Sequence, residues 1–243
     1  MPYLSRTEIE AIACRVIAAY VALPAHQDQM VTAVDPGVLA EDLLGLSVEY
    51  HRLSLGGAIH GATSFAPLNV LVYDDPEHPE YCSLDGKTIF IEQELWENSS
   101  KTGRRHFTIA HEASHQIYKM LYPKEYQSGL HCRTIHYYSD SPSRSPDDWD
   151  EWRTNALAAA ILMPSDMLRL NMADLGLGEK LKSLYRGGRD YERFRLLALQ
   201  MGVSTQALAI RMQQLGLLGS YYFGNSNDLI TAIAGDDEVR KGG

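Results

Sequence analysis

The chain has 243 residues, 45% of them hydrophobic, and a chain of this length can bury a core without disulfides or structural metal ions. Its 22 Lys and Arg residues stand against 31 Asp and Glu residues, and the resulting net charge of −9 argues against a protein that coats nucleic acid. Cys14, Cys82 and Cys132 share no C-x-x-C spacing, and no apolar run reaches the length of a membrane span. We therefore expect a cytoplasmic protein without a signal segment.

The first hundred residues are expected to combine helices with a small sheet. Ser5 and Glu8 form a capping-box pattern, and apolar residues then recur at helical spacing until Pro24 ends the first helix. A short helix and three strands are expected next, over residues 35–44, 46–53, 69–73 and 88–91.

The remaining chain is expected to be mainly helical. Apolar spacing predicts helices over 105–121, 149–163, 191–201 and 205–215. Residues 139–146 lack apolar anchors and predict a mobile loop, and residues 202–204 predict a tight turn between the last two helices. The segment after Ser220 is expected to fray.

The predicted helix over 105–121 contains the H-E-x-x-H motif, with His111, Glu112 and His115 as its polar residues. A step of four residues turns an α-helix by about 400° and advances it by about 6 Å, so both imidazoles project from one face and can bind one cation. Glu112 lies beside them, where its carboxylate can accept a proton from a water molecule at the metal. Zinc suits this donor set, because three protein ligands leave its fourth position open.

The third protein ligand is expected from a different part of the chain. The metzincin continuation of the motif is absent, because Tyr118 and Leu121 occupy the positions of its Gly and third His. Glu151, near the start of the second long helix, is the best candidate, and Asn155 one turn later is expected to orient a ligand. Three neighbouring carboxylates are rivals, although acidic residues are also common at helix starts: Asp147, Asp148 and Asp150.

Further polar residues lie between the two long helices. We expect His131, Cys132 and His136 to flank the site rather than to bind the metal, although a thiolate is a good zinc ligand. Peptide hydrolysis also needs a hydrogen-bond donor for the oxyanion, and four side chains remain candidates: His131, His136, Tyr137 and Tyr138. The strand over 88–91 is either a plain core strand or an edge that accepts an extended substrate.

The segment from Glu179 to Arg211 has seven basic residues against three acidic ones in an otherwise acidic chain. This local charge fits phosphate contacts, and hence a DNA-binding regulator whose metal is structural. We favour a solvated helix face or a docking surface for an acidic protein, because the second helix of the pair offers few side chains that read bases. A partner that binds without cutting is a third possibility, and the presence of Glu112 counts against it.

Two segments resemble the ImmA/IrrE family of metallopeptidases. Residues 105–115, RHFTIAHEASH, resemble the family pattern R-R-F-T-I-A-H-E-x-G-H, and residues 151–164, EWRTNALAAAILMP, resemble E-x-x-A-N-x-F-A-A-x-L-L-M-P. Residues 203–217 are similar to a third family stretch, V-S-x-x-A-L-x-x-R-L-x-x-L-G-L. With the elements before the first motif, the resemblance covers about Leu4 to Leu218.

The resemblance implies an α+β fold with a zincin-like metallopeptidase domain over 1–170, a helix-turn-helix-like segment over 171–220 and a flexible tail over 221–243. It implies zinc bound by His111, His115 and Glu151, with Glu112 as the base. The implied partner is a helix-turn-helix repressor of a mobile element or stress response. The chain departs from the family at Ser114, which replaces a Gly, and in the long interval between the two motifs. The residues after Leu218 are too few for the sensor domain of some relatives.

Overall fold

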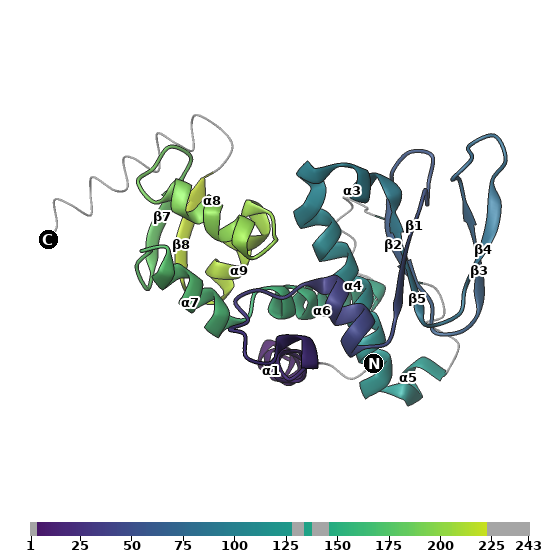
Figure 1. Cartoon of the computed structure of the whole chain (residues 1–243), viewed down its shortest axis with the longest axis horizontal. Coiled ribbons are helices and arrows are strands. Elements are labelled where there is room, and N and C mark those ends of the chain that lie inside the picture. The colour runs from purple at the N-terminus through teal and green to yellow at the C-terminus, as the bar shows by residue number, and fades with distance from the viewer. Residues whose placement is uncertain (1–3, 128–133, 138–145, 223–243) are drawn as a thin grey trace, which may run out of the picture.

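The computed structural model describes residues 4–127, 134–137 and 146–222 of the chain (Figure 1). Its helices are α1 (Arg6–Val21), α2 (Pro36–Val38), α3 (Gln93–Glu97), α4 (Thr102–Leu121), α5 (Pro123–Gln127), α6 (Pro146–Leu162), α7 (Ser165–Asp174), α8 (Tyr191–Gln200) and α9 (Thr205–Gln214). Its strands are β1 (Ser47–His51), β2 (Ile59–Thr63), β3 (Leu68–Val72), β4 (Glu80–Leu84), β5 (Thr88–Glu92), β6 (Thr134–Tyr137), β7 (Leu181–Tyr185) and β8 (Leu218–Tyr222). The short helical turns are η1 (Pro24–His26), η2 (Leu39–Leu43) and η3 (Ser99–Lys101). The fold is α+β, as the sequence predicted.

The first two helices begin where local capping chemistry predicts. The Ser5 hydroxyl accepts the backbone N–H of Glu8, and the Glu8 carboxylate accepts the backbone N–H of Ser5, which completes the predicted capping box of α1. The Asp35 carboxylate accepts the N–H groups of Gly37 and Val38 at the start of α2. Gly45, with φ of +65°, follows the end of η2. These helix starts are therefore confirmed.

A four-stranded sheet with the order β1-β5-β2-β6 forms one layer of the protein. All five residues of β5 are buried, and its side chains alternate between two cores. Ile89 and Ile91 pack with α4, whereas Phe90 packs with Val70 and Leu84 of the β3–β4 hairpin on the opposite face. Because β5 is hydrogen-bonded to β1 on one side and to β2 on the other, the suggestion that this strand accepts a substrate was wrong.

Helix α4 lies between the sheet and the C-terminal elements (Figure 1). The Gln116 side-chain amide donates to Thr63 Oγ1 at 2.7 Å and to the carbonyl of Ser64 at 2.8 Å, which links α4 to the end of β2. On another side, the Tyr118 hydroxyl donates to the carbonyl of Arg153 in α6 at 3.2 Å. These buried hydrogen bonds hold α4 between β2 and α6.

The C-terminal elements share the main core with the rest of the protein. Phe194 of α8 and Leu208 of α9 belong to the same buried cluster as Ile109 of α4. The predicted helix pair is present. Strands β7 before it and β8 after it form a parallel pair that the sequence did not predict. Tyr221 and Tyr222, beyond the expected end of order at Ser220, belong to β8.

Some expectations concern residues that are not described. The expected loop over 139–146 lies outside the described residues, except for Pro146, which begins α6. The expected tail from 223 onward also lies outside them. Within the described ranges, no helix combines the length and the apolar character that a membrane crossing requires.

Candidate metal centre

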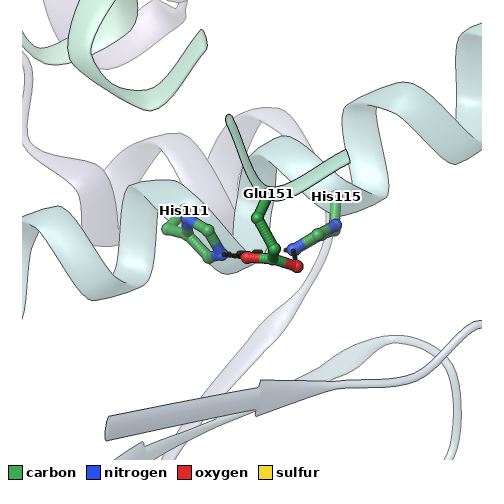
Figure 2. A group of neighbouring side chains, drawn as sticks. All are labelled: His111, His115 and Glu151. Atoms are coloured by element: carbon green, nitrogen blue, oxygen red, sulfur yellow. Dashed lines mark hydrogen bonds and ion pairs between the residues drawn. The ribbon is translucent and has the colours of Figure 1, made fainter. Parts of the chain in front are cut away.

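Helix α4 places the two histidines of the motif on one buried face, as its periodicity predicted. His111 is 7% exposed and His115 is 4% exposed. Their Nε2 atoms lie 3.2 Å apart and point into the same space (Figure 2). A helical repeat of 3.6 residues is enough to explain this pairing, because residues four apart are neighbours on a helix surface.

Glu151 of α6 approaches the two imidazoles from across the α4–α6 contact (Figure 2). One carboxylate oxygen lies 3.3 Å from His111 Nε2, and the other lies 3.8 Å from His115 Nε2. The ligand atoms of all three residues lie within 4.8 Å of one another. The structure therefore brings together the three residues that the sequence proposed as metal ligands, and this group could hold a metal ion.

Both imidazoles are held through their second ring nitrogen. His111 Nδ1 donates to the Asn155 side-chain oxygen at 2.9 Å. The Thr154 hydroxyl donates to the backbone carbonyl of Asp150 at 2.8 Å, so its oxygen accepts a weaker hydrogen bond of 3.4 Å from His115 Nδ1. A proton on each Nδ1 leaves a lone pair on each Nε2 of the neutral rings, which is the tautomer that binds a metal.

The donor set fits a small divalent cation. In this tautomer, two Nε2 lone pairs and two carboxylate oxygens lie close together, an arrangement that suits a metal ion. Tetrahedral zinc with ligand bonds of about 2.0–2.1 Å separates its ligand atoms by about 3.3 Å. The distances of 3.2 Å between the nitrogens and 3.3 Å from His111 to Glu151 are close to that value, and the distance of 3.8 Å from His115 to Glu151 is longer.

Among the rival carboxylates, only the side chain of Asp150 is described, and it is not part of the metal group. Asp150 pairs with Arg153 within α6, so its carboxylate is directed along the helix, and its candidacy as the third ligand is not supported. The side chains of Asp147 and Asp148 lie outside what the structure describes.

Glu112 is completely buried on α4, where its carboxylate lies against Gly61 of β2. Burial raises the pKa of its carboxyl well above the usual value, and the nearby charge of Glu151 raises that pKa further. A carboxyl with a raised pKa is a stronger base when ionised, which suits a group that accepts and returns protons.

Gly61 of β2 is a site residue that the sequence reasoning missed. A Cβ atom at Gly61 would lie 2.6 Å from Thr108 Cγ2 and 2.8 Å from Glu112 Oε1. Only glycine therefore lets β2 pass this close to the Glu112 carboxylate without displacing it. The sequence signal was available, because a glycine inside a strand often marks a close approach of the backbone to another group. Thr154, next to the predicted Asn155, was also missed.

The four candidates for oxyanion stabilisation belong to the segment between α5 and α6. Two of them, His131 and Tyr138, lie outside the described residues, as does Cys132, which was expected to flank the site. The backbone of His136 and Tyr137 belongs to β6, the edge strand that pairs with β2, and Tyr137 is the partner of Ile59. The suggested roles of these residues remain predictions.

A groove of about 1080 Å³ opens onto the metal group. It is bounded by residues of α1, β2, α4, α6 and α9, so the C-terminal helix pair forms part of its wall. Trp152 and Asn155 line it beside Glu151, and Ala207 and Ile210 line it from α9.

The basic segment differs from the surface that its charge suggested. Arg211 is 3% exposed and forms a bidentate ion pair with Glu10, so its inclusion among residues available to a partner was wrong. Arg193 and Arg195 remain exposed and pair with the acidic residues Asp190 and Glu192 on their own helix.

The start of α9 is packed against α4. A Cβ atom at Gly103 would lie 2.6 Å from the backbone nitrogen of Ser204, the N-cap of α9. A Cβ atom at Gly202 would lie 2.6 Å from His106 Nδ1. Ser204 and Gln206 at this end of α9 stay exposed and line the groove, so the start of α9 forms part of the groove wall.

No model of a known protein family matches the chain, and a search of curated proteins finds no relative. The interpretation of the site therefore rests on its own residues and their geometry.

Proposed function

We propose that the protein is a zinc-dependent endopeptidase that hydrolyses a peptide bond in a regulatory protein. The observation that carries the proposal is the convergence of His111, His115 and Glu151 beside the buried carboxylate of Glu112, at the side of a large groove. A group of three metal ligands alone is compatible with many functions, both structural and catalytic. A carboxylate base next to it, with room for a polymeric substrate, favours metal-assisted hydrolysis.

Each residue of the metal centre has a defined part in this proposal. His111, His115 and Glu151 would hold the zinc ion, while Asn155 and Thr154 hold the two imidazoles in the required tautomer. When bound, zinc supplies a Lewis acid that polarises the scissile carbonyl and lowers the pKa of water. Glu112 would accept the proton of the attacking water and deliver it to the leaving amine.

The class of substrate rests on the resemblance of residues 105–115 and 151–164 to the ImmA/IrrE family. On that basis we propose a zincin-like core, membership of the family, and a helix-turn-helix repressor as the substrate. The free thiols of Cys14 and Cys82 fit a reducing compartment, so we place the activity in the cytoplasm. The burial of Arg211 removes one cation from the basic segment and so favours a protein partner over DNA.

The proposal is tested with Glu112→Gln. The amide preserves the size of the side chain but cannot accept the proton, so this variant should keep its zinc and its melting temperature and lose hydrolysis by a factor of about 1,000 or more. The measurement combines zinc content with mass spectrometry of new peptide termini, after incubation with a peptide library and with native cell extract.

The matched control is Glu97→Gln, which changes an exposed carboxylate of α3 that accepts a hydrogen bond from Gln93. This control should cleave at the parent rate. Cleavage at the parent rate by zinc-loaded Glu112→Gln would contradict the role of Glu112. Absence of new termini with the zinc-loaded parent protein would contradict the peptidase proposal itself.

A further inference from the structure

The groove has the size of a large binding site. Its volume of about 1080 Å³ is at the upper end of the range of about 300–1,000 Å³ that is typical of small-molecule pockets. Its walls come from five different elements, and His111 and Glu151 of the metal group are among the lining residues. These dimensions suit several residues of an extended chain.

Charged side chains along the groove are of two kinds. Glu10 and Arg211 neutralise each other through their bidentate ion pair. Arg6 and Arg104 are exposed, and in the part of the chain that the structure describes neither lies within ion-pair distance of a carboxylate. Apart from the Glu10–Arg211 pair and the residues at the metal group, the charged side chains of the described groove lining are therefore basic. The charge of Arg104 lowers the pKa of Glu94, a carboxylate outside the lining, so Arg104 is partly compensated.

The two arginines have different neighbours in the groove. The Arg6 guanidinium lies 6.0 Å from the ring centre of Trp152, so this side chain of α1 contacts α6. Near Arg104, burial lowers the pKa of His60 and the charge of Arg104 lowers that pKa further, while the charge of Glu94 raises it. His60 and Arg104 both line the groove.

The position of Arg104 on α4 sets a distance from the reacting bond. Arg104 precedes His111 by seven residues, which is two helical turns and about 10 Å along the helix axis. An extended peptide advances about 3.3 Å per residue, so about three residues span this distance. A substrate side chain about three residues from the scissile bond would thus lie beside the Arg104 guanidinium.

We propose that the groove selects a peptide segment with an acidic side chain about three residues from the scissile bond, and that Arg104, assisted by Arg6, is the residue that recognises it. This inference rests on the proposed peptidase function, because that function places the scissile bond at the metal group. The chain has a net charge of −9, so an acidic segment is attracted only where exposed basic side chains lie outside close ion pairs. Arg104 and Arg6 are thereby specificity determinants and take no part in the proton transfer.

The test uses the full-length, zinc-loaded Glu112→Gln protein, which should bind peptides without cutting them. The probes are fluorescein-labelled peptides of twelve residues, built on one neutral sequence in which a single position at a time is Asp, Asn or Lys. Fluorescence anisotropy gives the affinity of each peptide. Arg104→Gln and Arg6→Gln are added to the protein separately, and Arg195→Gln, an exposed residue of α8 paired with Glu192, is the matched control.

One or two neighbouring positions should favour Asp over Asn by about fivefold, the upper end for a partly exposed ion pair. Arg104→Gln should reduce this preference below about twofold, Arg6→Gln should reduce it less, and Arg195→Gln should leave it unchanged. Salt of about 0.5 M should also reduce the preference, because it screens exposed charges. Equal affinities for Asp and Asn at every position, no binding of any peptide, or a preference that survives Arg104→Gln would overturn the inference.

The same peptides separate this inference from the proposed function. Parent protein that binds with an Asp preference but leaves every peptide intact would overturn the peptidase proposal and retain acidic selection by the groove. Hydrolysis without an Asp preference would retain the peptidase and overturn the role of Arg104.

Discussion

Two clusters of ionisable groups join helices of this protein, and they differ in the balance of hydrogen-bond donors and acceptors. In the Glu10–Arg211 cluster, the guanidinium donates to both carboxylate oxygens, and its Nε donates to the carbonyl of Met163 at 3.1 Å. In the metal group, the two Nε2 atoms and the Glu151 oxygens face one another, and all are acceptors when each neutral imidazole carries its proton on Nδ1. The first cluster is complete within the chain, whereas the second could hold a metal ion.

Burial does not separate the two clusters, since Arg211 is 3% exposed and His115 is 4% exposed. The difference is the balance of donors and acceptors. A guanidinium and a carboxylate satisfy each other, so the first cluster connects α9 with α1 and the end of α6 without a ligand. The comparison teaches that a buried cluster is a candidate metal site when it gathers several ligand-type acceptors rather than one matched donor and acceptor.

The largest expected effect comes from removing a histidine of the metal group. His111→Ala or His115→Ala should reduce zinc from about one ion per chain to less than about 0.1, because two of three protein ligands do not hold the ion. Metal analysis of protein purified without added zinc measures this. Arg211→Met serves as the control from the other cluster, and full zinc occupancy in either histidine variant would break the comparison.

The carboxylate ligand should show the next largest effect. Glu151→Gln replaces a charged ligand by a neutral amide and should weaken zinc binding by about 100-fold, in competition with a chelator of known affinity. Asp150→Asn should change zinc affinity by less than about threefold, because Asp150 pairs with Arg153. Equal losses in both variants would mean that the wrong carboxylate has been assigned.

A smaller effect is expected from the residue behind His111. Asn155→Ala removes the acceptor that fixes the Nδ1 proton, and it should lower zinc affinity by about 10-fold. The same chelator competition measures this change, with the melting temperature of the metal-free protein as the control. An unchanged affinity would show that Asn155 does not position the imidazole.

The smallest effect on zinc is expected in the other cluster. Arg211→Met retains the apolar stem but leaves Glu10 without its ion pair, and it should lower the free energy of unfolding by about 2 kcal/mol. Glu10 is partly exposed, which limits the cost. Urea unfolding measures the change, and zinc content should stay within error of the parent. Loss of zinc in this variant would show that the two clusters are coupled.

Local patterns predicted the parts of the structure that depend on neighbours in the chain. The capping box at Ser5, the helix around His111 and the helix pair at the C-terminus are present where the sequence placed them. These features depend on spacings of three or four residues, which a helix converts directly into contacts. The short strands β2, β4, β7 and β8 were not predicted, because five-residue segments of mixed polarity become strands only through their partners.

The sequence by itself determined that His111, Glu112 and His115 lie together, since helical geometry alone brings two imidazoles to one face and sets a carboxylate beside them. Only the tertiary structure decided that Glu151 completes the group and that Asp150 does not, because the packing of α6 on α4 joins residues that are 36 positions apart. It also decided that β5 is an interior strand, that Gly61 lies against Glu112 and that Arg211 is buried. These outcomes depend on contacts between distant segments, and such contacts leave no regular spacing in a single sequence.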